Sequence, residues 1–548
     1  MRASFLLTLF LTVFVSAAPV VEIRDDTQIT SNILAPFTIL DKTAQPVTRQ
    51  ITFNLAPIQM APDGYSRTLY AVNGQYPGPM IRCNKGDQLV ITVKNELGVY
   101  TTVHWHGLFQ LGTTWYDGVP GVSQCLIPHQ SNFVYNFTTA GQSGTYWWHA
   151  HYMAQYLDGL LGALIIHDHE DPYLTAYDYE YVVTLTDWYH QSSSQLLSQF
   201  LTPGYNGSNV TAPSSDCKSN SELAVYKVTK GKKYRFRLIN TSAQAAFIFS
   251  IDNHPMKVIE VDGIIVKSFE INRISMHVAQ RYSVIIDANN DVKNYWIRAT
   301  LSPECIPHSN TTINFNSAIN YNVTAILSYD GADNKDPETN AFTDFVRPCR
   351  NLNNSLIKPY FESKLSDKIV DTSSYNVTFG TTANKVKAAF INNSSYVSDF
   401  NSPTDIKVIT YDIDAKTLPT SQNIKEYDDS LYGGVAEIIV YNSNQANHPF
   451  HFHGRTFYLV GEGENGTKVD ESTFNLVDPP IRDTTVVPAG GWTVIRFILN
   501  NPGIWVFHCH IEWHIELGML IQTVESPKAL QTLKVPDNVK ALCSNYGT

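Results

Sequence analysis

The sequence predicts an all-β protein made of several consecutive β-sandwich domains. Strand-like runs with β-branched or alternating apolar residues recur along the chain, among them DQLVITVKN, EYVVTLTDW, KYRFRLIN and WTVIRFIL. Glycine, proline, asparagine and aspartate interrupt these runs roughly every eight to fifteen residues, which is typical of sandwiches. Long helical periodicity is absent, and one helix is expected to begin within HCHIEWHIELGM.

Residues 1–17 have the features of a secretory signal peptide. Arg2 supplies the positive charge, Phe5 to Val15 form an apolar core of about eleven residues, and Val15-Ser16-Ala17 is a small-residue cleavage site. Residues 18–47 show no clear strand pattern and are interpreted as an N-terminal arm or a propeptide. No later stretch reaches the roughly eighteen apolar residues that a spanning helix needs, so we expect no membrane anchor.

A chain of 548 residues is too long for one hydrophobic core. Changes in composition predict domains at residues 48–166, 167–330 and 361–548, with the polar segment 331–360 as a linker. The net charge of −11, with no basic block, argues against nucleic acid and anionic membranes as partners. Eleven N-x-S/T sequons indicate a glycosylated surface. We therefore expect a secreted monomer, extracellular or in the cell wall.

Histidine pairs of the form His-x-His carry the candidate chemistry. Four of them fall in the first and last predicted domains: HWH (104, 106), HAH (149, 151), HFH (451, 453) and HCH (508, 510). A fifth, HDH (167, 169), lies at a predicted domain boundary and is discounted. Residues i and i+2 of a strand point to the same face, so four pairs can place eight imidazoles in one cleft between domains. Imidazole binds several transition metals, so the count alone does not identify the metal.

A cysteine among the candidate ligands identifies the metal. The sequence has seven cysteines, at 83, 125, 217, 305, 349, 509 and 543, and in an oxidising compartment one is left without a disulfide. Cys509 is the expected free thiol because its neighbours are ligand types. A thiolate, two histidines and a weak axial methionine form a blue-copper site. His514 and Met519 follow Cys509, and His448 of HPFHFHG is the candidate second imidazole. A core side chain is the alternative for Met519.

The chain resembles the fungal multicopper oxidases of laccase type. The resemblance is carried by HWHGLFQLGTTWYDGVPGVSQC, GTYWWHAH, HPFHFHG, PPIRDTTVVPAGGWTVIRF and NPGIWVFHCHIEWHIELGM, with GKKYRFRLIN and AQRYSVIIDA between them. It covers roughly residues 50 to 545. It implies three cupredoxin-like Greek-key sandwiches and four copper ions per chain, one of type 1, one of type 2 and two of type 3. The implied reaction couples one-electron oxidation of phenolic or related aromatic donors to reduction of O2 to water.

The same resemblance implies a ligand for each copper. His104 and His451 would hold type 2, and His448, Cys509 and His514 would hold type 1 with Met519 axial. The two type 3 ions would be held by His106, His149 and His510, and by His151, His453 and His508.

Two acids are candidate proton donors for O2 reduction, which consumes protons. The family places acids at the positions of Asp117 and Glu512, and together with Cys509 we assign them catalytic roles. The plainer alternatives are a turn residue for Asp117, in YDG, and an exposed acid at a helix start for Glu512.

The resemblance also implies disulfide pairings. Cys125 would bridge to Cys543 and Cys305 to Cys349, which leaves Cys83 and Cys217 as a pair by elimination. Connectivity cannot be deduced from the sequence itself.

The donor is the least determined part of the prediction. Iron-oxidising relatives place acids around the type 1 site, where this chain has Ser192 to Ser194 and Asn444. Asp216 and Glu222 are the only acids in the loop expected to bind a phenolic proton. A methionine at 519 favours easily oxidised donors, since the axial ligand tunes the potential. Ferroxidase or ascorbate-oxidase-like chemistry is the alternative. A copper-storage protein without turnover and a zinc protein are remote ones.

Overall fold

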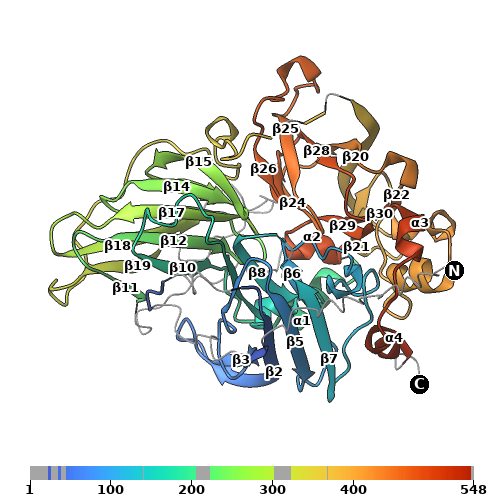
Figure 1. Ribbon diagram of the computed structural model, residues 1–548, viewed down its shortest axis with the longest axis horizontal. Coiled ribbons are helices and arrows are strands. Elements are labelled where there is room, and N and C mark those ends of the chain that lie inside the picture. Colours follow the sequence, from blue (N-terminus) through green and yellow to red (C-terminus); the bar gives the residue numbers. More distant parts are fainter. Residues whose placement is uncertain are drawn as a thin grey trace, which may run out of the picture.

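The computed structural model describes residues 23–25, 35–38, 45–139, 141–204, 223–301, 322–363, 365–366 and 368–544. In this part of the chain, six β-sheets form three pairs, and each pair is drawn from one continuous stretch of sequence. Figure 1 shows the three resulting sandwiches in blue, green to yellow, and orange to red. The architecture confirms the predicted all-β fold class. The expected signal peptide lies outside the described residues.

The first sandwich contributes half of the histidine pairs. One of its sheets contains β1 (Ile23–Asp25), β2 (Thr48–Met60), β3 (Arg67–Val72), β5 (Gln88–Asn95) and β7 (Ser131–Thr138). The facing sheet contains β4 (Ile81–Asn84), β6 (Val103–His106), β8 (Gly144–Ala150) and β9 (Leu161–His167). Ile51, Phe53 and Leu55 alternate with exposed residues along β2, as expected for a strand with one face in the core.

One strand lies where the sequence shows no strand pattern. β1 belongs to the segment interpreted as an arm or propeptide, and it pairs in parallel with the start of β2. Strands pair through backbone hydrogen bonds, which every sequence can supply, so an alternation of apolar residues is not required for such a pairing.

None of the four His-x-His pairs lies in the second sandwich. Its sheets contain β10 (Tyr179–Leu185), β12 (Lys233–Asn240), β17 (Arg281–Asp287), β14 (Met256–Val261) and β15 (Ile264–Ile271) on one side, and β11 (Val225–Val228), β19 (Asn322–Tyr329), β18 (Asn294–Leu301), β13 (Phe247–Ile251) and β16 (Ile274–Met276) on the other. Helix α1 (Ser193–Phe200) follows β10 and begins with a capping box between Ser192 and Gln195.

The third sandwich holds the remaining pairs. Its sheets contain β20 (Ile369–Thr381), β21 (Lys387–Ile391), β23 (Val435–Asn442), β25 (Phe457–Gly463), β26 (Ile481–Arg482) and β28 (Trp492–Ile498), and β22 (Ile424–Tyr427), β24 (His448–Phe452), β27 (Thr484–Val487), β29 (Gly503–Cys509) and β30 (Leu520–Glu525). Three helices complete it: α2 (Glu512–Glu516), α3 (Pro527–Gln531) and α4 (Asp537–Ser544). Helix α2 is the helix expected within HCHIEWHIELGM.

The first and third sandwiches share one continuous hydrophobic core. The predicted Cys125–Cys543 disulfide is confirmed, and it fastens helix α4 to the first sandwich with a Cα–Cα distance of 5.2 Å. Cys349 is also disulfide-bonded. Cys217 and Cys305 lie outside the described residues, so the other two pairings stay predictions. Among the described helices, none has the length and apolar character to cross a bilayer.

Candidate metal centre

The four histidine pairs come from two pairs of neighbouring strands. In the first sandwich β6 pairs antiparallel with β8, and His104 lies opposite His149. In the third sandwich β24 pairs antiparallel with β29, and His451 lies opposite His508. The second histidine of each later pair stands just beyond the end of its strand. The two-residue period therefore turns both rings of each pair to one side, and the sheet register brings neighbouring pairs together.

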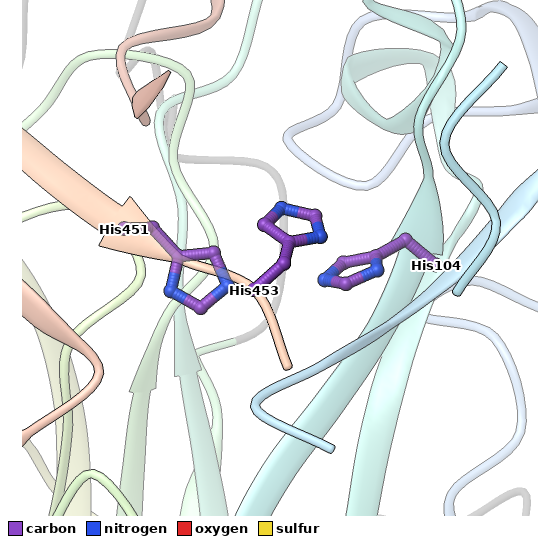
Figure 2. Close-up of side chains that lie close together, drawn as sticks. All are labelled: His104, His451 and His453. Atoms are coloured by element: carbon purple, nitrogen blue, oxygen red, sulfur yellow. The ribbon is translucent and has the colours of Figure 1, made fainter. Parts of the chain in front are cut away.

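The eight imidazoles meet between the first and third sandwiches. Ring centroids of His104 and His453 are 4.0 Å apart, and those of His106 and His451 are 3.8 Å apart. The Nε2 atoms of His453 and His508 are 3.0 Å apart. Figure 2 shows the ring of His453 between those of His104 and His451, which come from different sandwiches. The separation between the Nε2 atoms of His453 and His508 suits two nitrogens that share an ion bound at about 2.0 Å.

Hydrogen bonds fix which nitrogen of each ring faces the centre. The Nδ1 atoms of His104, His149 and His451 lie 2.6, 2.9 and 2.9 Å from the backbone carbonyls of Asp117, Ala150 and Asp483. Among the described residues, the Nε2 atom of each of these three rings is buried without a hydrogen-bond partner. A buried nitrogen without a partner is costly. Donation from Nδ1 leaves the lone pair of Nε2 for a metal, so the donor set fits a metal cluster.

Burial keeps the imidazoles neutral, as metal ligands must be. Burial, followed by the neighbouring imidazoles, lowers the pKa of a large group of them well below the ordinary value of histidine: His106, His149, His151, His451, His453 and His510. Burial lowers the pKa of His508 to about 4. Three or more protonated rings in this space would repel one another, so the rings stay neutral. Their free nitrogen lone pairs could then bind a cation.

A second group lies on the other side of Cys509. The Sγ atom of Cys509 is 3.6 Å from Nδ1 of His448 and 3.4 Å from Nδ1 of His514, and the two nitrogens are 3.0 Å apart. Cys509 is a buried free thiol, as expected, and burial raises its pKa. Met519 is buried beside the group, and its backbone C=O accepts a hydrogen bond from the Cys509 N–H. One thiolate and two imidazoles are the equatorial ligands of a blue-copper site.

The two groups are joined through consecutive residues. His508 and Cys509 end strand β29, and His510 follows directly. His508 contacts His453 in the inner group, whereas Cys509 contacts His514 in the outer one. His510 lies among the inner imidazoles, with ring centroids 5.1 Å from His106 and 5.4 Å from His149. The alternation predicted from the sequence is therefore present.

Both candidate acids are buried, and Asp117 contacts the inner group directly. Asp117 is buried, its Oδ2 accepts a hydrogen bond from Nδ1 of His453 at 2.8 Å, and its Oδ1 is 3.3 Å from Nδ1 of His104. Glu512 is buried rather than exposed, and burial followed by Glu516 raises its pKa well above the ordinary range. The discounted pair HDH takes no part in the described metal-ligand groups, since His167 instead lies 3.7 Å from Glu180.

The structure adds a buried ion pair that the sequence analysis missed. Arg281 of β17 donates to both carboxylate oxygens of Asp483, at 2.7 and 2.5 Å, and its Nε donates to the carbonyl of Thr145. One Asp483 oxygen lies 3.8 Å from Nε2 of His106 and from Nδ1 of His451. The second sandwich thus supports the inner group of histidines through one guanidinium. Both residues lie in motifs quoted above, PPIRDTT and AQRYSVIIDA, but no spacing rule points from them to the histidines.

Comparisons with known proteins agree with this geometry. Multicopper oxidase family models match residues 54–171, 179–332 and 395–529. Laccase-1 of Cryptococcus neoformans var. neoformans is 33% identical over 91% of this chain and 84% of its own length. The laccase of Trametes maxima is 36% identical over 89% of this chain and 95% of its own length. An iron transport multicopper oxidase of Epichloe festucae is 34% identical over 90% of this chain and 78% of its own length.

Solved structures show the same two kinds of relative. The laccase of Botrytis aclada superimposes with a TM-score of 0.79 at 31% identity, covering 92% of this chain and 93% of the other. Fet3p, a multicopper oxidase of iron import, superimposes with a TM-score of 0.83 at 29% identity, covering 91% and 95%. From the paired sheets, the converging imidazoles, the buried thiol and these relatives together, it follows that this chain belongs to the multicopper oxidase family and is a laccase-like, copper-binding oxidoreductase.

Proposed function

We propose that this enzyme couples the oxidation of phenolic donors at the outer site to the reduction of O2 at the inner one. Each phenol loses one electron and one proton and becomes a phenoxyl radical. Four such electrons and four protons convert one O2 into two waters. The copper ions, when bound, supply the one-electron steps and the binding of O2, whereas the protein positions the ligands, excludes water and supplies protons.

The proposed coppers number four and take the ligands assigned by resemblance. His448, Cys509 and His514 would hold the outer ion, and Met519 would be its weak fourth ligand. The inner ions would be held by His104 and His451 (type 2), by His106, His149 and His510, and by His151, His453 and His508 (type 3). Ligand atoms of His448, Cys509 and His514, and those of His151, His453 and His508, lie within 4.8 Å of one another. The ligand atoms of His104 and His451, together with that of His453, also lie within 4.8 Å of one another, so this closeness supports three of the four sets directly.

The observation that carries the proposal is the segment His508-Cys509-His510. Its sulfur lies 3.4 Å from Nδ1 of the outer ligand His514, and Nε2 of its first histidine lies 3.0 Å from that of the inner ligand His453. An electron that reaches the sulfur therefore has a covalent route to the inner cluster. A storage protein has no use for such a connection between two different sites.

Asp117 and Glu512 are proposed to manage protons at the inner cluster. Asp117 Oδ1 is buried without a hydrogen-bond partner among the described residues, so it can accept a proton or a water hydrogen. Burial favours the protonated form of Glu512, which suits a proton donor at neutral pH. Asp117 also accepts a hydrogen bond from His453, so it orients that imidazole ring as well.

The decisive test is Cys509→Ser, assayed for oxygen uptake with a methoxyphenol. We expect the variant to fold, to keep its inner coppers, and to lose both the blue absorption and phenol oxidation. Copper counting and the spectrum of the inner ions serve as the control for folding. Phenol oxidation at the parent rate would show that electrons do not enter through this sulfur.

Iron oxidation is the second candidate, because two iron-transport relatives match the chain. At the described positions where iron-oxidising relatives place acids, this chain has none. Asn444 Nδ2 lies 3.4 Å from Nε2 of His448, where an acid would be needed. Ser193 donates to Asp158 at the start of α1 and serves that helix. Asp216 and Glu222 lie outside the described residues. A donor panel of a methoxyphenol, a dihydroxynaphthalene, ascorbate and Fe2+ separates these chemistries, and turnover of Fe2+ alone would overturn the laccase assignment.

Secretion as a glycosylated monomer belongs to the same proposal. The apolar leader and the density of sequons support it. One sequon is an exception, because Asn240 is fully buried and its side-chain amide donates to the carbonyl of Ala245. Peptide mapping of the secreted protein should find Asn240 without a glycan.

A further inference from the structure

A third buried acid lies where the first and third sandwiches meet. Asp405 is completely buried at the start of the short helical turn Ile406–Thr410, yet its side chain does not cap that turn. Both of its carboxyl oxygens are buried without a hydrogen-bond partner among the described residues. A buried polar group without partners costs free energy of folding, so the presence of Asp405 calls for an explanation other than stability.

Backbone hydrogen bonds fix Asp405 against the loop that follows Asp117. The N–H of Asp405 donates to the carbonyl of Val122 at 2.9 Å, and the N–H of Thr404 donates to the carbonyl of Gly121 at 3.3 Å. Asp117 stands shortly before these two acceptors in the chain. The two acids therefore approach one another from opposite sides of the seam between the first and third sandwiches, and two consecutive hydrogen bonds set the register of that seam.

Thr114 and Asp117 are the polar neighbours of Asp405 on the first sandwich. Asp117 is the C-cap of the helical turn η1 (Thr114–Tyr116), and its N–H donates to the carbonyl of Thr114 at 3.0 Å. Burial raises the pKa of Asp405 well above its ordinary value, the Thr114 hydroxyl beside it lowers that pKa in part, and the charge of Asp117 raises it again. No basic group of the described residues acts on this carboxyl. Asp405 is therefore protonated at neutral pH, with a second acid as its neighbour.

The neighbouring acid has an oxygen that lacks a donor. Oδ2 of Asp117 accepts from His453 at 2.8 Å, whereas its Oδ1 is buried without a hydrogen-bond partner in the described part of the chain. Asp405 thus carries an acidic hydrogen that needs an acceptor, and Asp117 carries an acceptor that needs a donor. A hydrogen bond between the two would satisfy both groups and would point the proton of Asp405 toward the inner cluster.

We propose that Asp405 stores a proton at this seam for the reduction of O2, and that Asp117, whose Oδ1 accepts from it, links it to the inner cluster. When O2 is reduced, the O–H bond of the Asp405 carboxyl breaks, its proton ends in one of the two waters formed, and a proton from the solvent restores the acid. Asp405 acts through Asp117, so it is a positioning residue. This inference rests on the proposed function, because it extends the proton path of the same reaction.

The test follows the O2 half-reaction in Asp405→Asn, which keeps the size of the side chain but cannot release a proton. Anaerobic bleaching of the blue absorption by a methoxyphenol should proceed at the parental rate. Recovery of the colour on mixing with O2 should slow by roughly 10- to 100-fold, at the lower end of what a positioned acid contributes. The slowing should be larger in D2O than in H2O, because proton supply has become the slow step.

The pH dependence separates a loss of protons from damage to the fold. The parent keeps Asp405 protonated between about pH 5 and pH 7, whereas the variant depends on protons from the solvent, so recovery should fall more steeply with rising pH in Asp405→Asn than in the parent. Asp405→Glu keeps an acid and should recover faster than Asp405→Asn. The urea midpoint of Asp405→Asn should not fall, because the parent carboxyl has no partner to lose among the described residues.

Asp399→Asn is the matched control. Asp399 lies on the same segment, but its side chain is 40% exposed and pairs with Lys407 at 2.7 Å. Its replacement should leave the rate of recovery and its pH dependence unchanged. Copper content and blue absorption show that each variant has formed its sites, and Asp405→Val, which also lacks the proton, repeats the test if Asp405→Asn does not load copper.

The outcomes separate this inference from the proposed function. Parental recovery in Asp405→Asn or Asp405→Val would overturn the role of Asp405, and so would a slowing that changes neither the pH dependence nor the effect of D2O. In either case, bleaching by the phenol and recovery with O2 in the parent uphold the oxidase assignment. Failure of the copper-replete parent to recover its colour with O2 would overturn both.

Discussion

Replacing Asp117 should slow the reduction of O2 without affecting the entry of electrons. Asp117 Oδ2 accepts a hydrogen bond from the His453 imidazole at 2.8 Å, its Oδ1 is 3.3 Å from the His104 ring, and its carbonyl accepts from the same ring at 2.6 Å. Removing one such supporting partner costs about 10- to 100-fold in metal affinity or activity. The side chain of Asp117 touches two ligands, so Asp117→Ala should lower activity by about 100-fold. Asp117→Asn keeps a hydrogen-bond acceptor and should lower activity by about tenfold.

Stopped-flow measurements separate the two half-reactions. Anaerobic mixing with a phenol bleaches the blue absorption of the outer site. The side chain of Asp117 contacts His453 and His104 of the inner group, so the bleaching rate should match that of the parent. Subsequent mixing with O2 restores the colour, and this recovery should be slowed by the factors above in the copper-replete variants. Slower bleaching with normal recovery would refute the assignment of Asp117 to the inner cluster.

Two other predictions follow from buried charges. Arg281→Ala leaves the Asp483 carboxylate buried without its guanidinium, so the free energy of unfolding should fall by about 3–5 kcal/mol. Arg281→Lys keeps a positive charge, so its free energy of unfolding should fall by less. Equal denaturant midpoints for the parent and both variants would contradict this prediction. Burial holds the pKa of His167, His277 and His448 at about 3 and that of His508 at about 4. Their unfolded forms take up protons below about pH 6.5, so stability falls as the pH drops below that value, by about 1.4 kcal/mol per group at about pH 5.5. Urea midpoints of the copper-free protein near pH 7 and pH 5.5 measure this, and copper-loaded protein should resist the change because bound copper competes with protons; a midpoint that rises on acidification would contradict it.

Local patterns in the sequence were sufficient for the fold class and for the types of ligand. Alternation along β2 and the turn residues between strands depend on neighbours in the chain, and they predicted strands correctly. They missed β1, which pairs in parallel with the start of β2. The expectation of an exposed Glu512, the plainer alternative for that residue, was wrong for a related reason: burial depends on what packs over a residue, and the local pattern HIEWH does not record that.

The sequence by itself determined that this protein has His-x-His pairs and one free cysteine between two histidines. A two-residue period turns each pair to one face, and it sends the sulfur of Cys509 to the opposite side from His508 and His510. Only the tertiary structure decided which rings meet. His104 lies against His453, Arg281 supports Asp483 from another sandwich, and Phe379 stands edge-on to His514. These contacts join residues far apart in the chain, and they depend on how sheets dock and strands align, which no spacing within a motif encodes.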